Sequence, residues 1–308
     1  MTGEFDFIAA LRAMATSPEA RGLGDDVALL GDLVLTHDMI AEGVHYLRFD
    51  PPESVGFKLA QVTLSDLAAK GATPVGALLG YCLGDAAWDR AFLIGLEEGL
   101  GDCPLLGGDT IALPAGAPRV LGLTAFGRAS GRVPDRGGGK PGDALWLVGT
   151  LGDSAAGLAL LLADAGASGP LVEAYRRPRA LLAEGRAMAP HASAMMDVSD
   201  GLLIDLKRLV TASGCGAKVD VAALSLSVAF VEARGSSLSD RLFAATGGDD
   251  YALLAAIPAD AEAALRKSLP SGAQRMRIGV LVEGSGIELH DAGAPVPLPE
   301  HLGHEHRS

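Results

Sequence analysis

Acidic side chains recur in glycine-containing turns beside apolar runs along this sequence. The turns are GLGDDVALL, LTHDMIAEGVH, TLSDLAAKGA, LLGGDT, MMDVSDG and ATGGDDYALL, and their acids are Asp25, Asp26, Asp38, Asp66, Asp109, Asp197, Asp200, Asp249 and Asp250. A single aspartate of this kind is most often a turn residue or a helix cap, because its short side chain bonds nearby backbone N–H groups. Their recurrence at strand and helix ends predicts instead that several of them converge on one cleft.

One of these acids, Asp66, lies on the apolar side of a predicted helix. Within residues 54–70 the i, i+4, i+7, i+11 spacing of a helical apolar stripe is followed by Val55, Leu59, Val62 and Asp66. The predicted polar face of the same helix is formed by Lys58, Gln61 and Ser65. An ionised carboxylate that faces the core needs a cation, a group of hydrogen-bond donors or a metal ion.

The stretch MMDVSDGLLIDL places Asp197, Ser199 and Asp200 where a strand-like run gives way to a helix-like one. The apolar stripe of that helix is formed by Leu202, Leu203, Leu206, Leu209 and Val210. Asp205 lies off this stripe, as Lys207 and Arg208 do, and is therefore predicted to be solvated. Asp200 could simply cap the helix, with no further role.

Many carboxylates with few basic residues nearby are typical of Mg²⁺-dependent phosphate chemistry. Hard cations take oxygen ligands and bridge carboxylates to substrate phosphates, so several ions would overcome the repulsion between these acids and a nucleotide. Arg136 and Lys140 are the candidate basic residues, although solvated linker charges explain them equally well. The sequence has no GxxxxGKS or GxxxxGKT loop, no kinase GxGxxG and no Rossmann GxGxxG, so any nucleotide site is of another kind.

Alternating strand-like and helix-like segments must position these residues, and they predict an α/β or α+β fold. Strands are predicted at 28–35, as a pair across a turn, and at 74–84, 119–129, 143–150, 194–198 and 251–257. Helices are predicted at 54–70, 88–102, 153–165, 178–188 and 201–213. The segment SGRVPDRGGGKPG (130–142) is the candidate boundary between two domains, 1–135 and 136–308, and the final GHEHRS is expected to be an exposed tail.

Composition limits the class of protein. The 308 residues are 49% hydrophobic and 20% charged, as in a globular enzyme of about two domains. A net charge of −13 argues against nucleic acid as a partner, since binding it needs a basic surface. We expect a cytoplasmic protein and no membrane contact, because no apolar run approaches the ~18 residues of a membrane span and the first 16 residues do not resemble a signal peptide. The cysteines, Cys82, Cys103 and Cys215, are expected to be buried thiols.

The motifs resemble those of a known family. GDDVALL, THDMIAEGVHY, LSDLAAKGATP, GGDT, KPGD, GDSAAGLALL, DVSDGLLIDL and GGDDYALL follow one another in the order, and at about the spacing, found in bacterial thiamine-monophosphate kinases. The resemblance runs from about Gly24 to Leu254, with a weaker likeness as far as His304. That family belongs to a superfamily with aminoimidazole ribonucleotide synthetase and selenophosphate synthetase, which share an acidic, metal-dependent ATP site.

The resemblance implies both a fold and a reaction. The fold has an N-terminal ATP- and metal-binding domain (1–135), whose sheet pairs with that of a second subunit to form a barrel across a homodimer, and a C-terminal α/β domain (136–308). The reaction transfers phosphate from ATP to thiamine monophosphate and gives thiamine diphosphate and ADP. Because the attacking phosphate oxygen is already ionised, positioning and Mg²⁺ would carry most of the catalysis, without a general base.

The resemblance also assigns the site, position by position. It implies that several Mg²⁺ ions are held around Asp26, Thr36, His37, Asp38, Asp66, Asp109, Asp197 and Asp200. Contacts with ATP are implied for Gly108, Asp109, Arg136 and Ser199. Contacts with thiamine monophosphate are implied for His45, Asp249 and His304.

Three of these positions depart from the family pattern. His37 stands where a hydroxyl-bearing residue is usual, which is harmless if the metal contact is made by the backbone carbonyl and weakens the assignment if it is made by the side chain. Asp249 stands where the family usually has Glu, so the carboxylate is one methylene shorter. His304 occupies the place of an aromatic residue that usually lines the thiamine pocket.

Two other functions remain open. Another member of the superfamily would use the same ATP and metal residues on a different acceptor, such as a formylglycinamidine nucleotide, although the spacing of DVSDGL to GGDDY and the VHY after Asp38 favour the thiamine enzyme. A non-catalytic protein would use the acids as a divalent-ion or nucleotide site. The presence of acidic motifs on both sides of the boundary argues against that, and a measurement of ATP turnover distinguishes the two.

Overall fold

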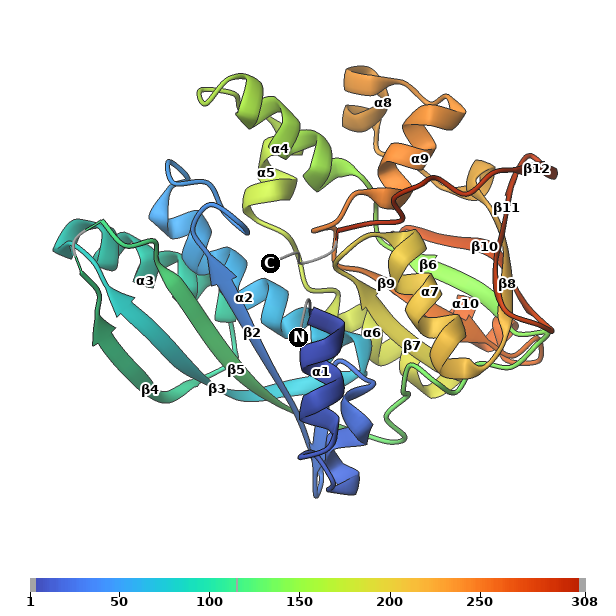
Figure 1. Cartoon of the computed structure of the whole chain (residues 1–308), viewed down its shortest axis with the longest axis horizontal. Helices are drawn as coiled ribbons and strands as arrows, with labels where there is room; N and C mark the ends of the chain where they lie inside the picture. Colours follow the sequence, from blue (N-terminus) through green and yellow to red (C-terminus); the bar gives the residue numbers. More distant parts are fainter. Residues whose placement is uncertain (1–3, 115, 305–308) are drawn as a thin grey trace.

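Two sheets with their helices lie side by side in the computed structural model, which describes residues 4–114 and 116–304 (Figure 1). The N-terminal sheet has the order β1-β2-β5-β3-β4. Its strands are β1 (Ala28–Leu30), β2 (Leu33–Ala41), β3 (Ala72–Leu83), β4 (Leu105–Ala112) and β5 (Val120–Ala129). All neighbours are antiparallel except β3 and β4, so β4 is a parallel edge strand.

Helices α2 (Pro52–Ala69) and α3 (Ala86–Leu100) cover one face of this sheet, and α1 (Glu4–Arg12) precedes it. The apolar stripe predicted for α2 is confirmed, because Val55, Leu59 and Val62 are buried in the N-terminal core. The two helices pack unusually close together, since a Cβ added at Gly95 would lie 1.7 Å from the carbonyl oxygen of Glu53.

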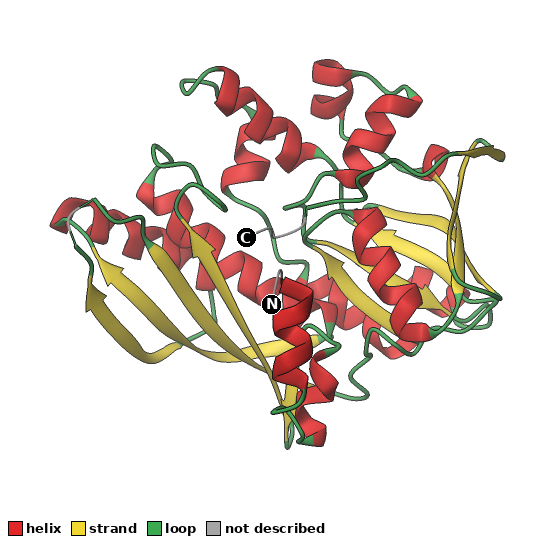
Figure 2. Cartoon of the chain, in the orientation of Figure 1, coloured by secondary structure: helices red, strands yellow, loops and turns green. Residues whose placement is uncertain are grey.

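The C-terminal sheet has seven strands in the order β12-β11-β8-β10-β6-β9-β7. They are β6 (Ala144–Val148), β7 (Ala194–Val198), β8 (Gly216–Asp220), β9 (Ala252–Ile257), β10 (Arg275–Val282), β11 (Gly286–Asp291) and β12 (Ala294–Val296). Every residue of β6, β7 and β9 is buried, because helices cover both faces of this part of the sheet (Figure 2). The helices are α4 (Asp153–Ala163), α5 (Pro170–Arg176), α6 (Leu182–Met188), α7 (Leu202–Ser213), α8 (Val228–Arg234), α9 (Leu238–Thr246) and α10 (Glu262–Ser268).

Helix α2 joins the two halves of the molecule. At its C-terminal end, Ala68 and Ala69 belong to the same apolar cluster as Trp146 and Met188 of the C-terminal half. The polar face predicted for this helix is not solvent-exposed: Lys58 and Ser65 are 2% and 0% exposed, and both contact the C-terminal half. Periodicity identifies a polar face, but it does not reveal that a second domain covers that face.

Most of the predicted elements are confirmed, with shifted ends. The helix expected at 178–188 begins only at Leu182, and the helix expected at 153–165 ends at Ala163. Strand β4 was not predicted, because LLGGDTIA has two central glycines and no alternation of polar and apolar residues. Within the described ranges, no helix is long and apolar enough to cross a membrane.

Candidate active site

Three aspartates from distant parts of the sequence meet between the two sheets. Asp26 precedes β1, Asp66 lies in the last turns of α2, and Asp197 lies near the end of β7. Each offers a carboxylate oxygen within 4.8 Å of the others. The sequence-based prediction that acidic turns converge is confirmed for these three residues, which we call the acid cluster.

Asp38 and Thr36 extend the acid cluster from strand β2. Asp38 lines the same cavity as Asp66 and Asp197, and its Oδ2 is buried with no hydrogen-bond partner among the residues that the structure describes. The Thr36 hydroxyl donates to a carboxylate oxygen of Asp66 and lies 3.3 Å from the carbonyl oxygen of Asp26. Side chains alternate along a strand, so these two residues share the face that looks towards α2.

The His37 side chain points to the opposite face of the sheet. Its Nδ1 lies 2.9 Å from the hydroxyl oxygen of Thr124, its neighbour on β5, and the imidazole is exposed. The structure therefore does not bring this side chain to the acid cluster. A metal contact through the backbone carbonyl of His37 stays a prediction.

Crowding raises the pKa values of most of these carboxyl groups. Burial is the largest cause and the neighbouring acids the next; together they raise the pKa of Asp197 to about 8 and that of Asp38 to about 6. The pKa of Asp66 is raised well above its ordinary value for the same reasons. Ionising all of them together requires a compensating cation.

The pKa of Asp26 is lowered rather than raised, because two cations contact this carboxylate. Burial acts to raise its pKa, but Lys70 and Arg136 outweigh burial and lower the pKa to about 2. The ammonium of Lys70 is fully buried and lies 2.6 Å from Asp25 Oδ1 and 2.8 Å from Asp26 Oδ2. Arg136, from the glycine-rich segment, pairs with the other oxygen of Asp26.

The donor set of the acid cluster and Asp38 fits Mg²⁺. All candidate ligand atoms are oxygens, one buried carboxylate oxygen of Asp38 has no partner among the described residues, and the raised pKa values indicate a deficit of positive charge. Small hard cations prefer such oxygen ligands. Histidine and cysteine, which would favour zinc, are absent from the described cluster.

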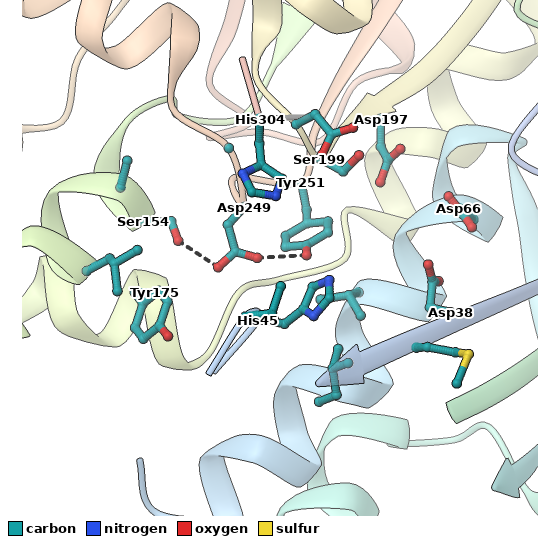
Figure 3. A pocket seen from close by; sticks show the side chains of 18 residues that line it. Asp38, His45, Asp66, Ser154, Tyr175, Asp197, Ser199, Asp249, Tyr251 and His304 are labelled. Carbon is teal, nitrogen blue, oxygen red and sulfur yellow. Dashed lines mark hydrogen bonds between the residues drawn. The ribbon is translucent and has the colours of Figure 1, made fainter. Parts of the chain in front are cut away.

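A cavity of about 360 Å³ opens beside the acid cluster (Figure 3). Asp38, Asp66 and Asp197 lie at one end of it, Tyr175 and Asp249 lie at the other, and His45 lies between them. The cavity thus joins a carboxylate-rich end to a mixed aromatic and polar end. Its lining consists of Asp38, Met39, Ile40, Val44, His45, Val62, Asp66, Ser154, Ala155, Leu158, Tyr175, Asp197, Ser199, Asp200, Gly248, Asp249, Tyr251 and His304.

The Asp249 carboxylate is held by three donors at the far end of this cavity. The buried ammonium of Lys58 pairs with Oδ2, the Ser154 hydroxyl donates to the same oxygen at 3.1 Å, and the Tyr251 hydroxyl donates to Oδ1 at 2.8 Å (Figure 3). Asp249 and Tyr251 both have positive φ, 72° and 54°, which is costly for residues other than glycine. The chain thus holds this carboxylate in a fixed place despite local strain.

The two histidines predicted to contact substrate line the same cavity. His45 Nδ1 accepts the backbone N–H of Ala41 at 3.0 Å, which fixes the ring at the end of β2. The backbone N–H of His304 donates to the carbonyl oxygen of Asp200 at 2.9 Å, which brings the C-terminal segment over the DVSDG turn. The remaining residues of the predicted tail, from Glu305 onwards, lie outside the described residues.

Within a single chain, Gly108 and Asp109 belong neither to the acid cluster nor to the cavity lining. Both lie on the exposed edge strand β4, and Asp109 Oδ1 accepts the backbone N–H of Thr110 at 2.9 Å. A Cβ added at Gly108 would lie 2.0 Å from the carbonyl oxygen of Leu79, so only glycine fits this position. Asp250 is also separate, because it accepts the N–H groups of Gly152 and Ser154 and caps α4.

Sequence reasoning missed or misjudged several contributors to the site. Asp205 was expected to be solvated, but it is 0% exposed and accepts the backbone N–H groups of Ser199 and Asp200. Lys70 was visible as the single cation inside LSDLAAKGATP, and its charge was the available signal. The three cysteines are buried and free, as expected.

Two family models match this chain. Residues 24–129 match the N-terminal domain of AIR synthase related protein, and residues 140–292 match its C-terminal domain. Together with the two sheets and the acid cluster between them, these matches define a two-domain protein of the AIR synthase-related class.

Individual relatives narrow the class. The thiamine-monophosphate kinase of Caulobacter vibrioides is 39% identical over an alignment 324 residues long, which covers 98% of this chain and 90% of that protein. The thiamine-monophosphate kinase of Escherichia coli K12 is 38% identical over 274 residues, 83% of each chain. The solved structure of AaThiL complexed with AMPPCP and TMP is 30% identical, has a TM-score of 0.84, and is matched over 98% of this chain and 97% of that one. The chain belongs to the thiamine-monophosphate kinase family.

Proposed function

We propose that this protein transfers the terminal phosphoryl group of ATP to thiamine monophosphate. The bond between that phosphorus and the ADP oxygen breaks, a bond to a phosphate oxygen of thiamine monophosphate forms, and the products are thiamine diphosphate and ADP. The observation that carries the proposal is the acid cluster at one end of a 360 Å³ cavity, in a chain of this family. Such a cavity suits a substrate with phosphate at one end and rings at the other.

Several Mg²⁺ ions complete the acidic end in this proposal. When bound, they neutralise the phosphates and the charge that develops during transfer. The residues that would hold them are Asp26, Thr36, Asp38, Asp66, Asp109, Asp197 and Asp200, with His37 through its carbonyl group. Gly108, Asp109, Arg136 and Ser199 would contact ATP, and Arg136 is already directed into this region by its pairing with Asp26.

His45, Asp249 and His304 would contact thiamine monophosphate beyond the acidic end. The thiamine rings carry a positive charge, and the Asp249 carboxylate, fixed by Lys58, Ser154 and Tyr251, offers a complementary negative group. No residue need remove a proton from the attacking phosphate oxygen, because that oxygen is already ionised. The chain's own contribution is therefore to orient the two substrates and to exclude water.

We also propose a homodimer in which the N-terminal sheets of two subunits pair into a barrel. Strand β4 supports this proposal, because it is an unpaired edge with exposed apolar side chains at Leu105, Leu106 and Ile111. Exposed apolar edges of this kind are typical of interfaces. Residues 1–135 would then serve ATP and metal binding and dimerisation, and residues 136–308 would form the C-terminal α/β domain.

The activity is tested by incubating the purified protein with ATP, Mg²⁺ and thiamine monophosphate and separating the thiamine esters by chromatography. We expect thiamine diphosphate and ADP in equal amounts, and neither product when EDTA is added. ADP formation with formylglycinamidine ribonucleotide but not with thiamine monophosphate would favour a different acceptor. No ADP with either acceptor would favour a non-catalytic nucleotide or ion site.

A further inference from the structure

We propose that Asp205 is a positioning residue that fixes the turn carrying Asp197, Ser199 and Asp200 in the orientation needed for metal binding. The proposal rests on the proposed function, because it assigns Asp205 a part in the same site. Asp205 lies in the first turn of helix α7, three residues after Leu202, does not line the cavity, and is fully buried. A carboxylate buried in this way must be compensated by several donors.

The backbone donors to Asp205 belong to the turn and not to the helix. Asp205 Oδ2 accepts the backbone N–H groups of Ser199 and Asp200, each at 3.1 Å. Helix α7 begins at Leu202, with Gly201 as its N-cap, so both donors precede the helix. An ordinary cap satisfies the N–H groups of the helix's own first turn. Asp205 instead accepts N–H groups that precede the helix, and so it holds the backbone of the turn that carries Asp197, Ser199 and Asp200.

The carbonyl side of the same turn is held from two other segments. The Ser199 carbonyl oxygen accepts the N–H of Asp249 at 2.6 Å, and the Asp200 carbonyl oxygen accepts the N–H of His304 at 2.9 Å. Both polar groups of each of these two peptide residues are therefore engaged. Removing the Asp205 carboxylate would leave the N–H groups of Ser199 and Asp200 without this acceptor and free the N–H side of the turn.

Arg208 carries the effect of Asp205 to the Asp200 side chain. One guanidinium nitrogen of Arg208, Nη1, lies 2.6 Å from Asp205 Oδ1 and 2.6 Å from Asp200 Oδ2. The buried Asp205 thus anchors the arginine, and the arginine sets the direction of the Asp200 carboxylate. A chain of charge-assisted hydrogen bonds connects a residue outside the cavity to one on its wall.

Three variants separate these two links. In Asp205→Asn the side-chain oxygen can still accept both backbone N–H groups, but the amide nitrogen then faces Arg208 and breaks the second link. Arg208→Gln breaks the same link from its more exposed end. Asp205→Leu keeps the branching at Cγ, with a somewhat larger side chain, and removes both links. Asp220→Asn is the matched control, because Asp220 also accepts backbone N–H groups, those of Ala222, Ala292 and Gly293, but does not line the cavity.

The measurement is the binding constant for Mg²⁺, obtained by titration calorimetry in the presence of a non-hydrolysable ATP analogue, together with the melting temperature of each variant. We expect Asp205→Leu to weaken Mg²⁺ binding roughly 10- to 100-fold, as is usual when a partner that orients a metal ligand is lost. Asp205→Asn and Arg208→Gln should weaken it by a smaller and similar factor. The variant that combines these two changes should bind Mg²⁺ no more weakly than either single variant, because each change removes the same link between Asp205 and Arg208.

A purely structural role gives a different result. Asp205→Asn and Arg208→Gln would then behave as Asp220→Asn does, with a lower melting temperature and the wild-type binding constant for Mg²⁺. That outcome overturns the proposal, and so does a wild-type protein that binds no Mg²⁺. A wild-type protein that binds Mg²⁺ but makes no thiamine diphosphate contradicts the proposed function alone, because the calorimetric comparison does not depend on turnover. Failure of Asp205→Leu to fold leaves the other two variants to decide.

Discussion

Asp66 is the residue on which the site depends most, because it has neighbouring acids on several sides and no cation in contact among the described residues. Burial and then Asp38, Asp197 and Asp26 raise its pKa well above the ordinary value. In the proposed reaction this carboxylate would contribute only when metal ions share the site. The crowding of buried carboxylates around Asp66 therefore destabilises the folded protein without metal and also provides the proposed metal ligands.

We expect Asp66→Asn to lower kcat roughly 100-fold or more and to leave the melting temperature without added metal unchanged or higher, because the change removes one charge from a crowded group. The measurement combines initial rates with thermal unfolding. Asp32→Asn is the control, since Asp32 is a turn carboxylate with 69% of its side chain exposed. A normal rate for Asp66→Asn would refute the metal role of this residue.

The raised pKa values predict how stability depends on pH. Asp197 and Asp38, whose pKa values are raised to about 8 and about 6, bind more protons in the folded than in the unfolded protein between pH 4 and pH 8. Stability in EDTA should therefore fall as pH rises through this window. Mg²⁺ competes with those protons, so the stabilisation that it provides should grow from pH 5 to pH 8. A melting temperature that Mg²⁺ raises equally at every pH would contradict this explanation.

Helix α2 is the element that places charge on both sides of the site. Asp66 on one side completes the acid cluster, and Lys58, two turns earlier, holds Asp249 at the opposite end of the cavity. Ser65 donates to Asp197 at 2.6 Å and Lys70 contacts Asp26 beyond the helix end. One helix therefore sets the relative positions of the metal end and the substrate end.

Lys58→Met tests this arrangement. The change removes the ammonium that holds Asp249 but keeps the length of the side chain. We expect KM for thiamine monophosphate to rise about tenfold while KM for ATP changes little, with a loss of stability of about 1–3 kcal/mol. Steady-state kinetics in both substrates measures the split, with the exposed Lys207→Met as control. An equal rise in both KM values would show that Lys58 acts only on the fold.

Hydrophobic periodicity and short apolar runs predicted elements such as α2, β7 and β9 well. Periodicity misjudged Asp205 and gave no sign that Lys58 and Ser65 are buried. These polar side chains lie off the apolar stripes of their helices but are covered by another domain or by a preceding turn. The hydrophobic pattern of a helix distinguishes its apolar face from its polar face, but it does not indicate what packs against the polar face. The convergence of Asp26, Asp66 and Asp197 was predictable, whereas their partners Lys70, Ser65 and Thr36 depend on tertiary contacts.

At the scale of the whole molecule, the exposed edge of the N-terminal sheet predicts self-association. Leu106, 62% exposed on β4, lies close to Gly108 and Asp109, which are outside the acid cluster of their own chain. We expect Leu106→Glu to shift a dimer towards monomer in light scattering and to lower activity in parallel. Leu162→Glu, at a similarly exposed position on α4, should do neither. A wild-type protein that is monomeric at micromolar concentration would contradict the dimer.

The central claim is phosphoryl transfer to thiamine monophosphate, and the most direct measurement follows the phosphorus itself. The protein is incubated with ATP labelled in its terminal phosphate, Mg²⁺ and thiamine monophosphate, and the label is located after separation of the products. We predict that the label appears in thiamine diphosphate, one equivalent for each ADP formed, and that Asp66→Asn largely abolishes it. Label recovered only as inorganic phosphate, or retained in ATP, would contradict the account.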